Sequence, residues 1–159
     1  MPDSYHVRIA KAEHTFCAAH FITFDGQCER LHGHNYHVAA EVAGPLDENH
    51  YVVDFIFLRD KLRAITAELD HYVLLPTESA QIRVEDNGRE VTASFEDRRW
   101  VFPSGDCRLL PLANTTAELL AAHIGRQLCS ALDDIGFQPT RLSVEVDECN
   151  GQLGVWSTS

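Results

Sequence analysis

Three histidines and one cysteine lie close together near the start of the chain, at a spacing that suits a metal site. Cys28, His32 and His34 belong to the run Cys-Glu-Arg-Leu-His-Gly-His, and His20 lies a short distance before them. His32 and His34 are two residues apart, so in an extended chain both side chains leave the same face, and Gly33 lets the backbone approach an ion. A hairpin return would bring His20 beside this pair. We therefore expect the three histidines to bind one metal ion.

Zinc is the favoured ion for this ligand set. Three protein ligands that leave a fourth position open describe a catalytic zinc site, whereas a structural site is usually closed by four ligands. Non-haem iron normally takes two histidines and a carboxylate, so Glu29 would have to bind the ion, yet its side chain points away from those of His32 and His34 in an extended run. The competing interpretation is chance pairing, since the chain has nine histidines.

Cys28 is either a fourth ligand that closes a structural site or a thiol beside a bound cation. A neighbouring cation lowers the pKa of a thiol and gives a thiolate that can remove a proton from a substrate at neutral pH. The spacing Cys-x-x-x-His is unusual for zinc fingers and favours the second role. Glu29, the next residue, is by itself consistent with one solvated acid in an acidic protein.

The chain has the composition of a soluble globular protein. Its 159 residues suffice for one domain with a sizeable core, and we expect a single domain over 1–159. The net charge of -11 disfavours nucleic acid and anionic membranes as partners, because the overall field repels phosphate groups. A small phosphorylated substrate stays compatible with local cations such as Arg30, Lys11 or Lys61.

Targeting signals and cysteine usage both bear on location. The first residues lack the apolar core of a signal peptide, and no run is long enough to span a bilayer. The five cysteines have no framework spacing, which fits a reducing compartment. We therefore expect a cytoplasmic protein with no membrane partner.

Hydrophobic periodicity predicts two strands, two helices and two more strands, in that order. The segments 7–21 and 35–42 alternate in polarity and end at turns, so we expect them to pair and to carry the histidines. Asp54 is expected to cap a helix that ends near Leu69. A second helix opens with a capping box at 115–118 and is stopped by Gly136. Strands over 141–147 and 153–156 pair across the Asn150-Gly151 turn.

Residues 75–113, between the two helices, are predicted to form an ordered β excursion. Asn87-Gly88 lies between two alternating runs and is a strong hairpin signal, and the segment has aromatic and β-branched residues without low-complexity sequence. The excursion leads back towards Thr115. It therefore either covers the binding pocket, changes the substrate, or decorates a subunit edge.

Six motifs in order make the chain similar to the 6-pyruvoyl-tetrahydropterin synthase and 6-carboxy-tetrahydropterin synthase family. The resemblance covers most of the chain except the excursion, which is the main departure from the family pattern. It implies an α+β T-fold (tunnelling fold), in which subunits form a barrel, commonly a hexamer of two trimers, with active sites between subunits. The motifs are Phe16-Cys17-Ala18-Ala19-His20, Cys28-Glu29-Arg30-Leu31-His32-Gly33-His34-Asn35-Tyr36, Val53-Asp54-Phe55, Leu69-Asp70-His71, Asn114-Thr115-Thr116-Ala117-Glu118 and Val146-Asp147-Glu148.

The resemblance implies roles for the residues that would carry out the reaction. It makes the three histidines the zinc ligands and Cys28 the residue that removes a substrate proton. Asp70 and His71 would form a partner proton relay, which is physically sensible because a carboxylate beside an imidazole sets its tautomer and raises its basicity. Zinc would polarise the substrate hydroxyls and stabilise the negative charge that develops.

The resemblance also implies residues that would bind the pterin. Glu148 resembles the pterin anchor, since its two carboxylate oxygens can accept hydrogen bonds from the amino group and the ring nitrogen. Thr115 and Thr116 resemble contacts to the pterin edge, although a role as helix caps explains them equally well. Glu145 lies on the polar face of the same strand as Glu148, and we expect it to be solvated.

The reaction implied first is conversion of 7,8-dihydroneopterin triphosphate to 6-carboxy-5,6,7,8-tetrahydropterin, acetaldehyde and triphosphate, an early step toward queuosine and other 7-deazapurines. The short gap in Cys-x-x-x-His-Gly-His resembles the bacterial enzymes of this reaction. Glu29 complicates it, because Glu-x-x-His-Gly-His resembles a variant branch that makes 6-hydroxymethyl-7,8-dihydropterin for folate synthesis. In that branch Glu takes the place of the thiol, so the resemblance also implies Glu29 as a candidate base. Other interpretations are 6-pyruvoyl-tetrahydropterin synthase activity and a non-catalytic pterin-binding or purine-binding module.

Overall fold

The computed structural model describes residues 3–11 and 14–158. Two helices are packed against a sheet within these ranges, α1 (Phe55–Ala67) and α2 (Ala117–Asp134). The strands are β1 (Tyr5–Ile9), β2 (Thr15–His20), β3 (Thr23–Phe24), β4 (Gln27–Cys28), β5 (His32–Gly44), β6 (Tyr72–Pro76), β7 (Arg83–Asp86), β8 (Glu90–Phe95), β9 (Arg98–Pro103), β10 (Cys107–Leu110), β11 (Arg141–Cys149) and β12 (Gln152–Thr158).

The main sheet has seven strands in the order β10-β6-β2-β5-β11-β12, with β1 also paired to β5. β5 is long enough to pair with β2 along its first half and with β1 along its second half. The extended segment predicted over 7–21 therefore forms two strands. The antiparallel pairing of β2 with β5 places His20 directly opposite His32, so the hairpin return expected from the sequence is present.

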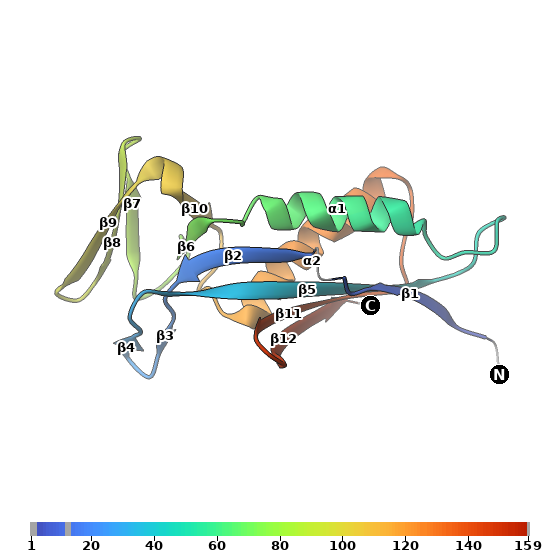
Figure 1. Cartoon of the computed structure of the whole chain (residues 1–159), viewed down its shortest axis with the longest axis horizontal. Coiled ribbons are helices and arrows are strands. Elements are labelled where there is room, and N and C mark those ends of the chain that lie inside the picture. Colours follow the sequence, from blue (N-terminus) through green and yellow to red (C-terminus); the bar gives the residue numbers. More distant parts are fainter. Residues whose placement is uncertain (1–2, 12–13, 159) are drawn as a thin grey trace.

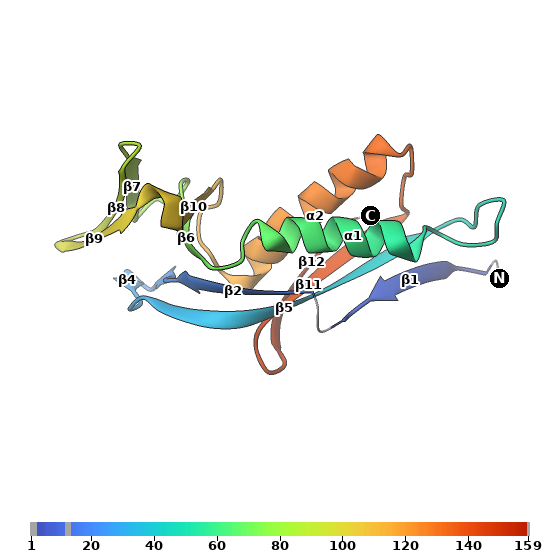
Figure 2. The same ribbon diagram turned by 45° about the horizontal axis from the view of Figure 1, so that its top comes forward.

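Both helices begin where their capping residues predict. The Asp54 side chain accepts a hydrogen bond from the Ile56 amide at 2.8 Å, and the Thr116 side chain accepts one from Leu119. Gly136 follows α2 with a φ of +74°, which a residue with a β-carbon rarely adopts. Figures 1 and 2 show both helices over one face of the main sheet.

Alternation along β5 and β11 divides their side chains between the two faces of the sheet. The apolar set is buried against α1 and α2 in the main core, and the same face carries His32 and His34 at the beginning of β5. The buried members on these two strands are Tyr36, Val38, Ala40, Val42, Leu142, Val144 and Val146.

The predicted excursion contains a separate three-stranded sheet, β7-β8-β9, which lies at one end of the molecule (Figure 1). The Asn87-Gly88 turn joins β7 to β8 as expected, with a φ of +84° at Gly88. The boundaries predicted at 75–113 are too wide, because β6 and β10 pair in parallel and extend the main sheet. A parallel pair has no tight turn between its strands, so no local signal marks it in the sequence.

A second apolar cluster joins this small sheet to the rest of the protein. One side of β8 is buried against the segment around β3 and β4 and against the ends of β6 and β10. The cluster comprises Phe21, Cys28, Leu75, Ile82, Val91, Ala93, Phe95 and Cys107.

Candidate metal and active site

His20, His32 and His34 come together as the sequence predicts. Candidate ligand atoms of the three residues all lie within 4.8 Å of one another. The ring centroids of His20 lie 4.9 Å from His32 and 5.3 Å from His34, and those of His32 and His34 lie 4.8 Å apart. The pairing of β2 with β5 produces this arrangement, because it sets one histidine of β2 opposite the His-Gly-His run.

Backbone carbonyls orient two of the rings. Nδ1 of His20 lies 2.8 Å from the Thr115 carbonyl oxygen, and Nδ1 of His32 lies 2.8 Å from the Arg30 carbonyl oxygen. A carbonyl oxygen can only accept, so Nδ1 carries the proton in both rings and Nε2 presents its lone pair. This is the usual tautomer arrangement of a histidine that binds a metal through Nε2.

The three imidazoles fit a metal ion. Nε2 of His20 and Nε2 of His34 are buried and have no hydrogen-bond partner among the described residues. The pKa of His20 is lowered to about 4, chiefly by burial and to a smaller extent by the neighbouring His32 and His34, although the hydrogen bond with the Thr115 carbonyl opposes this shift. A buried nitrogen that has a lone pair and no hydrogen-bond partner costs free energy. Binding a metal ion through this lone pair would remove that cost, so the neutral imidazole is suited to be a metal ligand.

Glu29 and Cys28 point in different directions. The Glu29 carboxylate lies beside the histidines, with Oε2 3.8 Å from Nε2 of His32, and it accepts a hydrogen bond from the Ile22 amide at 3.4 Å. The Cys28 side chain is buried in the second apolar cluster. Burial raises the pKa of this thiol, and nearby Arg98 opposes that shift. Glu29 therefore lies beside a histidine, whereas the Cys28 side chain is packed in the second apolar cluster.

The side chains of Asp70 and His71 contact each other, with Nδ1 of His71 2.9 Å from Oδ2 of Asp70. The relay that the resemblance implies for them stays a prediction. The other oxygen of Asp70 accepts from the Cys17 amide at 2.8 Å, and the His71 amide donates to the Cys17 carbonyl at 2.6 Å. Cys17 and His20 leave β2 on opposite faces because they are an odd number of positions apart. His71 lines a hollow of about 310 Å³ together with Cys17, and this hollow is distinct from the face that carries the histidines.

A hollow of about 380 Å³ lies where the beginning of α2 meets the turn between β11 and β12. Glu148 and Thr116 both line it, together with Ile22 and Gly154. These two predicted pterin contacts therefore share one cavity. Thr115 does not line it: this residue is fully buried, and its hydroxyl donates to the Phe21 carbonyl at 3.3 Å. Thr115 contacts the site through its backbone carbonyl, which orients the ring of His20.

Tyr36 connects the histidines with the two carboxylates. Its ring is fully buried, 5.8 Å from the ring of His20 and 5.5 Å from that of His34. Burial raises the pKa of its phenol well above the usual range, and Glu148 and then Glu29 raise it further. The Tyr36 hydroxyl has no hydrogen-bond partner among the described residues. Sequence reasoning gave this residue no role, although it ends the His-Gly-His-Asn-Tyr motif.

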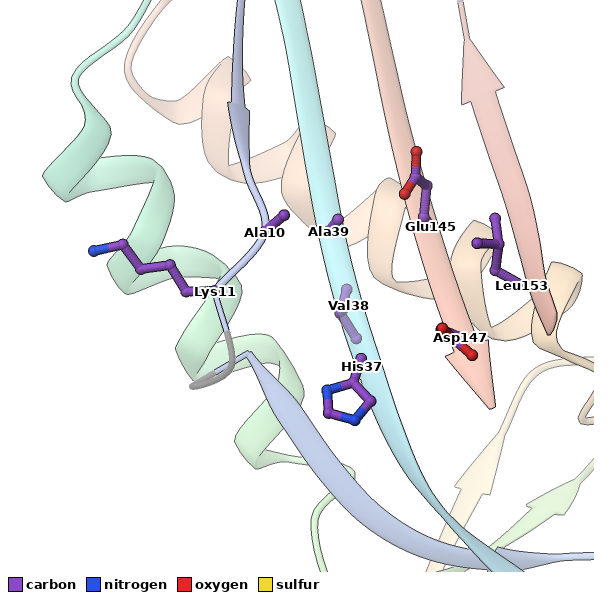
Figure 3. A pocket seen from close by; sticks show the side chains of 8 residues that line it. All are labelled: Ala10, Lys11, His37, Val38, Ala39, Glu145, Asp147 and Leu153. Atoms are coloured by element: carbon purple, nitrogen blue, oxygen red, sulfur yellow. The ribbon is translucent and has the colours of Figure 1, made fainter. Parts of the chain in front are cut away.

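The face of the sheet away from the helices has a smaller hollow, of about 180 Å³ (Figure 3). Glu145, Asp147 and His37 line it. Glu145 is not simply solvated as predicted, because it pairs with Arg8 at 2.5 Å. Both oxygens of Asp147 accept hydrogen bonds, one from the Cys149 amide at the end of β11 and one from the Gly151 amide in the turn before β12. The carboxylates of Glu145 and Asp147 therefore make contacts that stabilise the fold.

Known proteins are similar to this chain over nearly its whole length. A sequence profile described as 6-pyruvoyl tetrahydropterin synthase matches residues 9–154. The chain belongs to this family. A Methanocaldococcus jannaschii protein, provisionally named 6-carboxy-5,6,7,8-tetrahydropterin synthase, is 29% identical over 139 residues, covering 86% of this chain and 85% of the relative. A Pyrococcus horikoshii protein of the same provisional name is 30% identical over 115 residues, covering 71% and 68%.

Solved structures extend this similarity to the fold. The 6-pyruvoyl tetrahydropterin synthase of Plasmodium vivax matches with a TM-score of 0.92 at 28% identity, over 99% of both chains. The Plasmodium falciparum enzyme matches with a TM-score of 0.92 at 29% identity, also over 99% of both. Other structures of the P. vivax enzyme carry a replacement of a catalytic glutamate, by alanine or by cysteine.

The predicted α+β T-fold is therefore confirmed at the level of the family fold. The match over 99% of both chains includes the β7-β8-β9 region, so the expectation that this segment departs from the family pattern was wrong for these relatives. Among the described residues, neither helix is both long enough and apolar enough to cross a membrane.

Proposed function

We propose that this protein is a zinc-dependent lyase that acts on 7,8-dihydroneopterin triphosphate. Membership of the 6-pyruvoyl tetrahydropterin synthase family supports a pterin substrate. The close grouping of His20, His32 and His34, with backbone carbonyls that orient the rings of His20 and His32, supports zinc, which prefers nitrogen ligands in a site with an open position. The hollow that Glu148 and Thr116 line supports a pterin ring held at its amino edge.

The position of Glu29 decides which residue we propose as the general base. Its carboxylate lies 3.8 Å from Nε2 of His32, whereas the Cys28 thiol is packed among apolar side chains with a raised pKa. A general base must reach the proton that it removes, so geometry favours Glu29. The catalytic glutamate of the P. vivax enzyme supports the same role. We therefore assign 6-hydroxymethyl-7,8-dihydropterin as the main product.

The chemistry at this site is cleavage between the two hydroxyl-bearing carbons of the substrate side chain. Bound zinc supplies a positive charge next to the substrate hydroxyls. Glu29 removes the proton of the hydroxyl farther from the ring, the carbon-carbon bond breaks, and that carbon leaves as an aldehyde that still carries the triphosphate. The released electron pair enters the conjugated ring, and the carbon next to the ring regains a proton to give the hydroxymethyl group.

Asp70 and His71 act in this scheme as the proton relay, supplied by a second copy of the chain. His71 lines a hollow with Cys17, whose side chain leaves β2 on the face opposite His20, and this supports a site built between subunits. The assembly proposed is a homo-oligomer, a hexamer of two trimers as the family resemblance implies. Its active sites then combine the histidines of one subunit with the relay of another.

A second candidate is the 6-carboxy-5,6,7,8-tetrahydropterin synthase reaction, for which Cys28 would be the base. Two observations favour it: the provisional names of the archaeal relatives, and the thiol at the first position of the Cys-x-x-x-His-Gly-His motif. This reaction requires Cys28 to leave the apolar cluster and face the substrate.

The test is to incubate the zinc-loaded protein with 7,8-dihydroneopterin triphosphate without oxygen and to identify the pterins by mass spectrometry. We expect 6-hydroxymethyl-7,8-dihydropterin from the wild type and from Cys28→Ala. Glu29→Gln should lower kcat by about 10² to 10⁴, the range typical of a lost general base. Acetaldehyde and the carboxy product, lost in Cys28→Ala, would establish the second candidate instead. Ligand binding without any turnover would indicate a pterin-binding module.

A further inference from the structure

Arg98 reaches from the β7-β8-β9 sheet to the backbone that carries both candidate bases. Its Nη1 donates to the Cys28 carbonyl oxygen at 2.6 Å, and its Nη2 donates to the Glu29 carbonyl oxygen at 3.2 Å. Two neighbouring carbonyls suit the fixed fork of a guanidinium, whereas the single ammonium of lysine cannot reproduce both bonds with the same geometry. One side chain of the excursion thus holds two consecutive peptide groups next to the metal site.

Arg98 is itself held in place by aromatic rings. Its guanidinium carbon lies 4.6 Å from the centroid of the Trp100 ring, and Trp100 stacks on Phe21 with centroids 4.5 Å apart. Phe21, which follows His20 in the chain, belongs to the second apolar cluster and packs there with residues of β8. The arginine is therefore fixed relative to the end of β2 and to the excursion at the same time.

The Cys28–Glu29 segment has a second attachment on its other side. The Glu29 amide donates to the Ile22 carbonyl at 3.0 Å, and the Ile22 amide donates to the Glu29 carboxylate at 3.4 Å. These bonds do not use the carbonyl oxygens of Cys28 and Glu29, which accept hydrogen bonds from Arg98 instead. The position of the Glu29 α-carbon, and with it the distance from the carboxylate to His32, depends on both attachments.

We propose that Arg98 is a positioning residue that fixes Glu29 beside the histidines, with the β7-β8-β9 sheet as its support. This inference rests on the proposed function and assigns the excursion a part in catalysis. Arg98 touches neither the histidines nor the carboxylate, so it acts on the reaction only through the backbone of residues 28 and 29. Loss of the contact moves the base and leaves the metal ligands and the pterin hollow unchanged.

The experiment compares Arg98→Ala and Arg98→Lys with the matched control Arg99→Ala. Arg99 is the next residue of β9, has the same charge, and is exposed on the other face of the strand. In the zinc-loaded protein, Arg98→Ala should lower kcat by about 10- to 100-fold, as expected for a misplacement of about 1 Å. KM should stay within about twofold and zinc content should not change, because Arg98 contacts neither the histidines nor the residues that line the pterin hollow. Arg98→Lys should recover part of the loss, and Arg99→Ala should equal the wild type.

Amide hydrogen exchange of residues 22–31 in the zinc-free protein gives a readout that does not need turnover. Faster exchange in Arg98→Ala than in Arg99→Ala is expected. An unchanged kcat in folded Arg98→Ala would overturn the inference, and so would a loss that appears in KM or in zinc content alone. If Arg98→Ala does not fold, Arg98→Lys decides by the same criteria. A wild type that makes no pterin product would refute the proposed function, whereas normal exchange in Arg98→Ala would refute the positioning role separately.

Discussion

The role of each histidine at this site follows from which of its ring nitrogens already has a hydrogen-bond partner. The protonated nitrogens of His20 and His32 are bound to carbonyls, and the remaining nitrogens face one another. Replacing His20 by alanine removes one of three ligands, so zinc affinity should fall by more than the roughly 100-fold typical of losing an outer-sphere partner. His37→Ala, on the other face of β5 (Figure 3), should bind zinc as the wild type does. Metal analysis after dialysis against a competing chelator measures both.

Asp70 gives a prediction about stability and pH. The hydrogen bond from the Cys17 amide, together with the neighbouring His71, holds the pKa of Asp70 below its usual range, although burial opposes this. A carboxyl whose pKa is lower in the folded state stabilises the fold above the unfolded pKa, near 4, and loses that contribution as the pH falls through the folded value. Urea unfolding between about pH 5 and pH 2 should therefore show a weaker pH dependence for Asp70→Asn than for the wild type. Identical slopes would contradict this account.

The parts of the site that could be predicted from sequence are those whose residues lie close together in one short motif. His-Gly-His specifies two ligands on one face of a strand, and the Asp-His pair is adjacent in the chain. Arg98 could not be found in this way, because its partners Cys28 and Glu29 are about seventy positions away and its contact is with backbone atoms that every residue type shares. The opposite directions of Cys28 and Glu29 also depend on tertiary packing, since β4 ends between them.

The helices depend on local capping as well as on burial. Asp54 accepts the Ile56 amide at the beginning of α1, which the sequence predicted and the structure confirms. Asp54→Ala should lower the free energy of unfolding by about 1 kcal/mol, because one amide of the first turn loses its acceptor. Asp60→Ala, inside the same helix and paired only with its neighbour Arg59, should change it by less than about 0.5 kcal/mol. Chemical denaturation of both variants tests this, and equal losses would argue against the cap.

Elements with tight turns could be located from sequence, whereas those joined by distant pairing could not. The Asn87-Gly88 and Asn150-Gly151 turns mark their hairpins directly, since both glycines have positive φ values. β6 and β10 form a parallel pair across the whole excursion, so only the folded chain brings them together. For this reason the excursion was predicted too long at both ends.

At the scale of the whole molecule, the sheet carries chemical groups on both faces. The histidines, Glu29 and the Glu148 hollow lie together with Tyr36 on the side of the helices. His71 lines a hollow with Cys17 on the opposite face of β2. A side chain cannot reach through a sheet to a substrate on the other face. If both groups act on one substrate, two copies of the chain must combine.

Mixed oligomers test this proposal directly. Glu29→Gln lacks the base and His71→Ala lacks the relay, so each alone should be inactive. Coexpressed in equal amounts, they should recover about a quarter of the wild-type activity, because random assembly pairs an intact base with an intact relay in about that fraction of sites. Glu29→Gln mixed with His32→Ala should recover nothing, since every site then lacks the base or a metal ligand. Equal recovery in both mixtures, or none in the first, would mean that the relay is not supplied by a neighbouring subunit.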